Sequence, residues 1–105
     1  MLRIHDVMLG VIRDMRPLIV AIERNDTQLA RQLKASASSV TLNISEGSGS
    51  FGGTRRERYR SALGSARETL SNLQTAEAFG YLRALPEDVV AGMNHVIGTL
   101  VHVAR

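Results

Sequence analysis

Hydrophobic residues recur every three or four positions along almost the whole chain, which is the spacing of one face of an α-helix. No stretch of the sequence alternates between hydrophobic and polar residues as a half-buried β-strand would. The pattern therefore predicts an all-α protein. The expected helices cover approximately residues 2–24, 26–47, 54–79 and 86–104.

Residues that begin and end helices occur at the first breaks in this pattern. The stretch NDT at 25–27 offers a cap for the second helix, and the glycines between 47 and 53 end that helix. Thr54 and Glu57 have the T-x-x-E spacing of a capping box, which predicts the start of the third helix at this point.

The later breaks follow the same logic. Gly80 suits the position just after the third helix, and Pro86 with Glu87 and Asp88 suits the first turn of the fourth. Because the connections are short, we expect an antiparallel up-and-down four-helix bundle. Pro17 lies inside the first helix, where proline removes a hydrogen bond, so we expect a kink there with the helix continuing.

A hairpin of the second and third helices about the glycine-rich turn predicts which residues face each other. In each facing pair the two residue numbers then add up to about 101. The segment ASASS at 35–39 is therefore expected opposite SALGSA at 61–66. Gly64 costs a helix about 1 kcal/mol relative to alanine, so we expect it to permit a close approach of the two backbones. The same register pairs acidic with basic residues: Glu68 with Lys34 or Arg31, and Glu46 with Arg55 or Arg56.

Length and composition predict a single domain, residues 1–105. The 105 residues are 44% hydrophobic and 22% charged, and a chain of this size buries about two thirds of its extended surface. The sequence contains no cysteine, which excludes a disulfide framework and a thiolate metal site. Asp6, Arg13 and Asp14 interrupt the first twenty residues, where a signal peptide needs an apolar core, so we expect a cytoplasmic protein.

The net charge of +3 is concentrated in one segment. Residues 54–60 hold four arginines and only Glu57 as an acid, and the rest of the chain carries nine basic and nine acidic residues. A local basic cluster is the electrostatic signature of an anionic partner. We therefore predict that the cluster binds the backbone of RNA or DNA; the alternative is a solvated face paired with Glu46 and Glu57. The cluster consists of Arg55, Arg56, Arg58 and Arg60.

The fourth predicted helix has no charged stripe. No Asp, Glu, Lys or Arg occurs in the sixteen residues 89–104, although a helix with one face in water normally carries charges. This stretch is too short and too polar for a membrane span, which needs about twenty apolar residues. Together with LIVAI at 18–22 it predicts the interface of a homo-oligomer. The expected interface residues are Leu18, Ile19, Ile22, Met93, Ile97, Leu100 and Val101.

Two sequence patterns invite a cofactor or metal interpretation that the predicted helices disfavour. Gly47, Gly49 and Gly52 form a G-x-G-x-x-G, but a dinucleotide loop follows a strand, and a helix is predicted here. His95 and His102 share a helix face with a separation of about 10 Å, too far for one ion within a single chain. We expect no cofactor and no metal.

An enzyme with His95 or Glu68 as base is the weakest of three functional hypotheses, because no matched acid, base and pocket accompanies either residue. We therefore predict a non-enzymatic protein. The main alternative to nucleic-acid binding is a scaffold that recruits a partner protein through the first and fourth helices or through the glycine-rich turn.

Two longer blocks match a family pattern in order and spacing. They are QLKASASSVTLNISEGSG at 32–49, similar to Q-L-x-x-A-x-x-S-x-x-x-N-I-x-E-G, and ALGSARETLSNLQTAEAFGYL at 62–82, similar to A-x-G-S-x-x-E-x-x-x-x-L-x-x-A-x-x-x-G-Y-[IL]. With these blocks the chain resembles the 23S rRNA-intervening sequence proteins, which include the accessory protein of diversity-generating retroelements. Matching positions, none with a catalytic role, are Asn43, Glu46, Gly47, Gly64, Ser65 and Glu68.

The resemblance implies a fold and an assembly more than an activity. It implies an up-and-down four-helix bundle that assembles into a ring-shaped pentamer. The retroelement relative looks like a basic barrel that binds nucleic acid and a reverse transcriptase.

Overall fold

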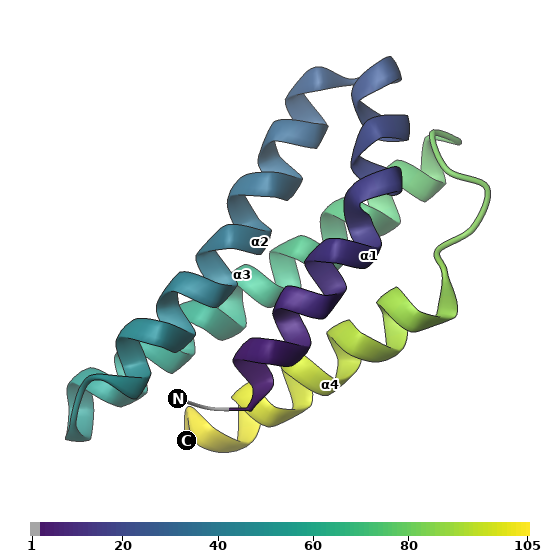
Figure 1. The fold of residues 1–105 in the computed structure, drawn as a ribbon. Helices are drawn as coiled ribbons and strands as arrows, with labels where there is room; N and C mark the ends of the chain where they lie inside the picture. Colours follow the sequence, from purple (N-terminus) through teal and green to yellow (C-terminus); the bar gives the residue numbers. More distant parts are fainter. Residues whose placement is uncertain (1–2) are drawn as a thin grey trace.

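The computed structural model describes residues 3–105, which form four helices and, within that range, no strand. The helices are α1 (Ile4–Asn25), α2 (Thr27–Ser48), α3 (Gly52–Ala78) and α4 (Glu87–Val103) (Figure 1). The all-α prediction is confirmed. The predicted start of the first helix at residue 2 lies outside the described residues.

The four helices pack as a closed circuit of neighbours. α1 contacts α2, α2 contacts α3, α3 contacts α4, and α4 returns to α1. The start of α1, the end of α4 and the α2–α3 turn lie toward one end of the bundle, and the other two connections lie toward the opposite end (Figure 1). The buried hydrophobic residues form one core cluster. Its largest fully buried members are Met8, Met15, Ile22, Leu33, Ile44, Leu73, Met93 and Leu100.

α1 continues through Pro17, as predicted. Proline has no N–H, so the carbonyl of Arg13 loses the partner that residue 17 would supply in a regular helix. The Nε of Arg16 donates to that carbonyl oxygen at 3.3 Å. A side-chain donor therefore replaces the missing backbone donor.

Two of the predicted helix caps form. The Asp26 carboxylate accepts a hydrogen bond from the N–H of Leu29 at 2.9 Å and caps α2. Gly80 has a φ of +80° just after α3, and the N–H of Tyr81 reaches back to the carbonyl of Ala76 at 2.9 Å. This is the Schellman arrangement expected of a glycine that ends a helix.

The cap predicted at Thr54 does not form. α3 begins two residues earlier, at Gly52, and Phe51 occupies the N-cap position without a side-chain cap hydrogen bond. Gly52 has a φ of +57°, a conformation that a glycine adopts at little cost, so the turn can enter the helix before Thr54. Glu57 accepts a hydrogen bond from Arg60 instead of capping the helix.

Small polar residues fill the seam between α2 and α3. The hydroxyls of Ser39 and Ser65 share a hydrogen bond of 2.8 Å, and Thr69 contacts Ser36 at 3.0 Å. The two small-residue segments therefore face each other, as predicted. The register is shifted by three residues, because Ser39 was expected opposite residue 62 and lies opposite Ser65.

The close approach of the two helices occurs at Gly47 and not at Gly64. A Cβ on Gly47 would lie 2.5 Å from Cε1 of the buried Tyr59 ring, whereas a Cβ on Gly64 would meet nothing within 4 Å. The shifted register places Ser65 at the seam and leaves Gly64 exposed. Gly47 also lies within α2, which ends at Ser48, so Gly47 does not terminate the helix.

The partner predicted for Glu68 is also wrong. Glu68 is exposed and forms no ion pair with a residue in the described part of the chain, and Lys34 pairs with Glu23 of α1 at 3.7 Å. The three-residue shift in register accounts for the difference, since it moves Glu68 away from the position expected beside Lys34.

Three of the seven residues predicted at an oligomer interface lie in the core of the single chain. Ile22, Met93 and Leu100 are each 0% exposed, because they lie on the inward faces of α1 and α4. These three residues therefore belong to the core of the single chain and not to the predicted interface. Leu18, Ile19 and Ile97 are partly buried, Val101 is 37% exposed, and for these four the interface remains a prediction. Over residues 3–105, no helix has the length and hydrophobicity that crossing a membrane requires.

The contrast between the two glycines is testable by substitution. Gly47→Ala should lower the free energy of unfolding by about 1–3 kcal/mol, because the new methyl group overlaps the confined Tyr59 ring. Gly64→Ala, the matched control, should raise it by about 0.5–1 kcal/mol through helix propensity alone. Chemical denaturation of both variants measures the difference. Equal effects of the two substitutions would contradict the packing described at Gly47.

Candidate nucleic-acid interface

The four arginines predicted to bind an anion lie in the first turns of α3, and all four are exposed. A cation near the N-terminus of a helix is mildly unfavourable, by about 0.3–1 kcal/mol, because the helix dipole is positive there. The four side chains differ in what they contact within the chain. They are Arg55, Arg56, Arg58 and Arg60.

Arg55 stabilises the turn between α2 and α3. Its Nε donates to the carbonyl oxygens of Ser50 at 2.9 Å and Gly47 at 3.2 Å. Its guanidinium carbon lies 5.8 Å from the centre of the Phe51 ring, which is a cation–π contact. The terminal nitrogens of Arg55 have no hydrogen bond to a described residue, so they can still donate to a ligand.

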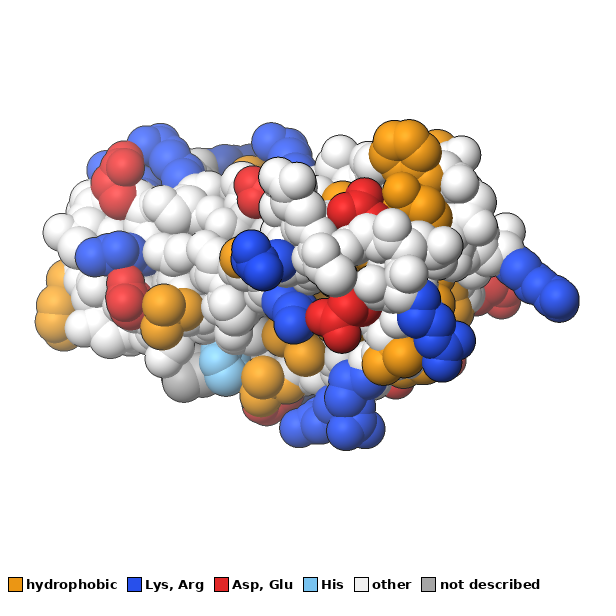
Figure 2. Space-filling model, turned by 90° about the horizontal axis from the view of Figure 1, so that it is seen from above, with side chains coloured by type: hydrophobic (Ala, Val, Ile, Leu, Met, Phe, Trp, Pro, Cys, Tyr) orange, Lys and Arg blue, Asp and Glu red, His pale blue; other side chains and the backbone are white. Residues whose placement is uncertain are grey.

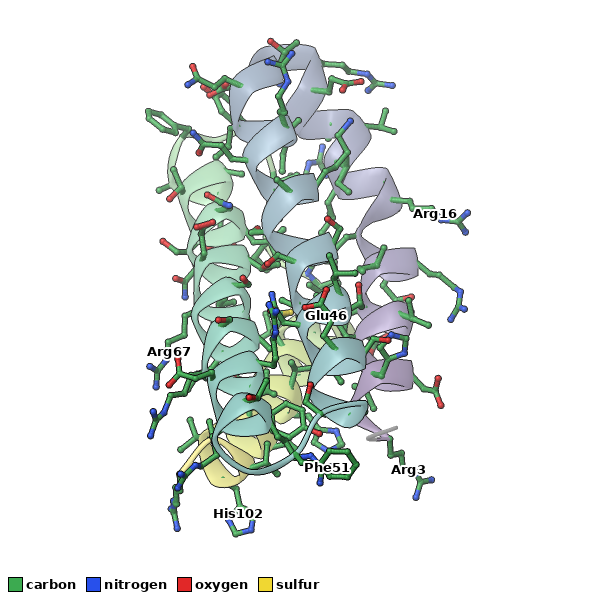
Figure 3. All side chains as sticks on the ribbon, turned by 90° about the vertical axis from the view of Figure 1, so that its left-hand side faces the viewer. Arg3, Arg16, Glu46, Phe51, Arg67 and His102 are labelled. Carbon is green, nitrogen blue, oxygen red and sulfur yellow. The ribbon has the colours of Figure 1, made fainter. Side chains whose placement is uncertain are left out.

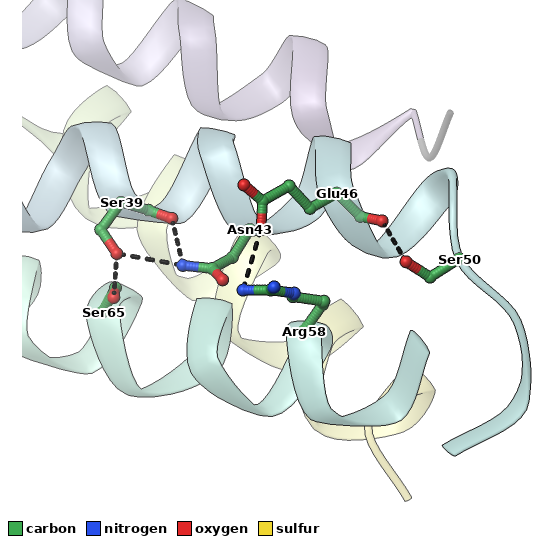
Figure 4. Close-up of polar contacts among 6 residues, drawn as sticks. All are labelled: Ser39, Asn43, Glu46, Ser50, Arg58 and Ser65. Atoms are coloured by element: carbon green, nitrogen blue, oxygen red, sulfur yellow. Dashed lines mark hydrogen bonds and ion pairs between the residues drawn. The ribbon is translucent and has the colours of Figure 1, made fainter. Parts of the chain in front are cut away.

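Arg58 forms an ion pair with Glu46 of α2, with 2.9 Å between Nη1 and Oε2 (Figure 4). Glu46 was predicted beside Arg55 or Arg56, so its partner lies about one turn further along α3. The two side chains are 48% and 43% exposed, and ion pairs at such exposure contribute about 0–1 kcal/mol. A phosphate could therefore compete with Glu46 for Arg58 at little cost.

Arg60 connects α3 to the end of α4. Its Nε donates to the carbonyl oxygen of Ala104 at 3.2 Å, and its Nη1 donates to Glu57 at 3.1 Å. Carbonyl groups at the end of a helix lack a helical partner, so Arg60 satisfies one of them. Its first role is structural.

Arg56 is the one member of the cluster without a hydrogen bond or ion pair to a residue in the described range. Its whole guanidinium group, with five N–H donors, is available to an external anion. Of the four arginines, Arg56 is therefore the clearest candidate for a ligand contact.

The fold adds residues that sequence reasoning missed. Figure 3 shows Arg3 and His102 at the same end of the bundle as Phe51, and the Arg60 contact to Ala104 brings Arg105 to this end as well. The predicted topology could have identified these residues, because an up-and-down bundle brings both ends of the chain to the same end as the α2–α3 turn.

We call this region the basic end and define it as residues 3–6, 46–60 and 102–105. It holds six arginines and three acidic residues, whereas the rest of the chain holds seven basic and seven acidic residues. The whole formal net charge of +3 therefore belongs to the basic end. On the face shown in Figure 2, basic side chains are interspersed with acidic ones and do not form one broad patch.

Asn43 and Ser65, two of the six residues that match the family pattern, belong to a hydrogen-bond network at the α2–α3 seam. Asn43 donates from Nδ2 to the carbonyl oxygen of Ser39 at 2.9 Å and to its hydroxyl at 3.1 Å, and that hydroxyl contacts Ser65 (Figure 4). These polar groups are satisfied by one another. Their arrangement holds two helices in register and offers no free nucleophile.

The histidines do not gather at one site. His5 lines a hollow with Ser38, Thr41, Leu42 and Ser45, whereas His95 lines a different hollow with residues of α1. Within residues 3–105, no group of three or more His, Cys, Asp or Glu side chains has an arrangement that could hold a metal ion.

Comparison with known proteins finds one family. A family model described as 23S rRNA-intervening sequence protein matches residues 18–98, from the second half of α1 into α4. No curated protein and no solved structure matches the chain.

The different roles of Arg56 and Arg60 predict different effects on stability. Arg60→Ala should lower the free energy of unfolding by about 0.5–1.5 kcal/mol, because the bond to Ala104 is lost. Arg56→Ala should change it by less than about 0.5 kcal/mol. Urea denaturation of both variants separates the two roles, and equal destabilisation would contradict them.

Proposed function

The chain belongs to the 23S rRNA-intervening sequence protein family, and we propose that it is a non-enzymatic protein whose basic end binds the backbone of RNA or DNA. The observation that carries the proposal is the location of the entire net charge of +3 at one end of the bundle, on exposed arginines. A basic cluster on one face is the electrostatic footprint of a protein that binds the phosphate backbone of nucleic acid.

The chemistry of the arginines supports a phosphate ligand. A guanidinium group presents paired N–H donors that match two phosphate oxygens. Arg56 offers all its donors and Arg55 offers its terminal nitrogens, while Arg58 is held by an exposed ion pair. These contacts neutralise phosphate charge without reading base edges, so the binding we propose depends little on sequence.

The absence of a catalytic role is part of the proposal. Catalysis needs a nucleophile or base held near its partners and near a bound substrate. Glu46 is paired with Arg58, and the Ser39, Asn43 and Ser65 side chains bond to one another in the seam.

We also propose that antiparallel up-and-down bundles of this chain assemble into a pentameric ring, as the family resemblance implies, and that the protein is cytoplasmic, because charged residues interrupt its first twenty positions. The outer face of α4 beyond its first turn supports an interface, because its exposed residues from position 89 onward are uncharged and include Val101. A ring would present several basic ends to one nucleic acid and raise the overall affinity through multivalency. Light scattering tests this part of the proposal, and a monomeric mass would contradict it.

A second candidate function is a scaffold that binds a partner protein. Exposed apolar side chains that do not belong to the basic end favour it: Val20 is 52%, Leu42 is 60% and Phe79 is 65% exposed. Binding through such side chains would depend weakly on salt and would not require Arg56.

Salt dependence distinguishes the two functions. Binding of a labelled RNA or DNA oligonucleotide should weaken steeply between 50 and 200 mM salt, on the order of tenfold or more. Arg56→Ala should weaken binding and reduce the slope of log K against log salt by about 1. Fluorescence anisotropy across a salt series measures both quantities.

Arg31→Ala is the matched control, because Arg31 is exposed on α2 outside the basic end. This substitution removes one positive charge, as Arg56→Ala does. It should leave affinity and slope close to those of the wild type. No binding at low salt, or equal losses from the two substitutions, would refute a specific role for the basic end.

A further inference from the structure

Phe51 is the most exposed large hydrophobic residue in the described part of the chain, at 84%. It lies in the turn between α2 and α3, where its backbone is the N-cap of α3 and its side chain makes no cap hydrogen bond. A phenyl ring in water forgoes the stabilisation that burial would provide. Apart from the cation–π contact with Arg55, no contact among the described residues accounts for an aromatic side chain at this position.

The Phe51 ring is held beside arginines that can bind phosphate. The Arg55 guanidinium lies 5.8 Å from the ring centre, and the Arg55 Nε is anchored by the carbonyl oxygens of Gly47 and Ser50. The anchored arginine lies over the ring, and its terminal nitrogens have no hydrogen bond to a described residue. Figure 3 shows Phe51 at the end of the bundle, beside the turn between α2 and α3.

The other aromatic residues cannot serve the same purpose at this end. Tyr59 is only 5% exposed and packs against Gly47. Phe79 stacks on Tyr81 with 5.4 Å between ring centres, at the start of the α3–α4 connection and away from the arginine cluster. All four aromatic residues of the sequence lie within residues 3–105, and among these described residues Phe51 is the one aromatic side chain that is both exposed and beside the cluster.

We propose that Phe51 stacks on an unpaired base while Arg55 and Arg56 bind the neighbouring phosphates, so that the ligand is single-stranded RNA or DNA. This inference rests on the proposed function, because it assumes that the basic end binds nucleic acid. Bases within a duplex stack on each other and present no free face, whereas a single strand offers a base face to an aromatic ring. Such stacking tolerates any base, which fits a site without groups that read base edges.

The test uses three ligands with the same number of phosphates: a single strand of about 12 thymidines, the same strand with abasic sites, and a duplex. The wild type should bind the thymidine strand most tightly. Phe51→Ala should weaken that complex roughly 5- to 100-fold, which is the range for loss of one stacked base. The same substitution should leave binding of the abasic strand unchanged.

Phe79→Ala is the matched control, since it removes an exposed phenylalanine distant from the arginines. It should bind all three ligands as the wild type does. Phe51→Trp reports on stacking at this position directly through its fluorescence, because the chain contains no tryptophan and the new side chain would be its one indole. Its fluorescence should be quenched by the thymidine strand and not by the abasic strand.

The outcomes separate this inference from the function on which it rests. If no ligand binds the wild type at low salt, both are overturned. If Arg56→Ala weakens binding while Phe51→Ala does not, and the three ligands bind equally, the basic end binds backbone alone and the stacking role is refuted. A loss for Phe51→Ala that is equal on abasic and thymidine strands would also refute stacking.

Discussion

The packing of Tyr59 against Gly47 determines the geometry of the end of the bundle where the arginines lie. The ring approaches so closely that a Cβ at position 47 would lie 2.5 Å from it, so the backbone of α2 forms one wall of the buried tyrosine site. This contact joins the last turn of α2 to the second turn of α3. The polar seam of Ser36, Ser39, Ser65 and Thr69 continues the same register along both helices.

The register in turn decides what each arginine can do. Because α2 ends beside the first turns of α3, Glu46 meets Arg58, and the carbonyl oxygens of the turn meet Arg55. The return of α4 to the same end brings the Ala104 carbonyl to Arg60. A cluster that looks uniform in the sequence is therefore divided between structural contacts and Arg56, which has none within the described chain.

Local signals predicted the fold well, and long-range packing explains where prediction failed. Asp26 and Gly80 act within a few residues of themselves, so their capping roles were readable from the sequence. The shift of α3 against α2, the exposure of Gly64 and the burial of Ile22, Met93 and Leu100 depend on how whole helices meet. Periodicity identifies an apolar face but does not say whether the core or another surface covers it. For the site, the sequence predicted the arginine cluster, and only the fold joined Arg3 and Arg105 to it.

The most direct test of the account is the position of amide chemical-shift changes when a single-stranded oligonucleotide is added to the labelled protein. Binding at the basic end should produce changes at residues 49–60, at Arg3 and at 102–105, with little change near the α1–α2 turn and the α3–α4 connection. Changes that concentrate at this opposite end, or that spread evenly over all four helices, would contradict a nucleic-acid interface at the basic end.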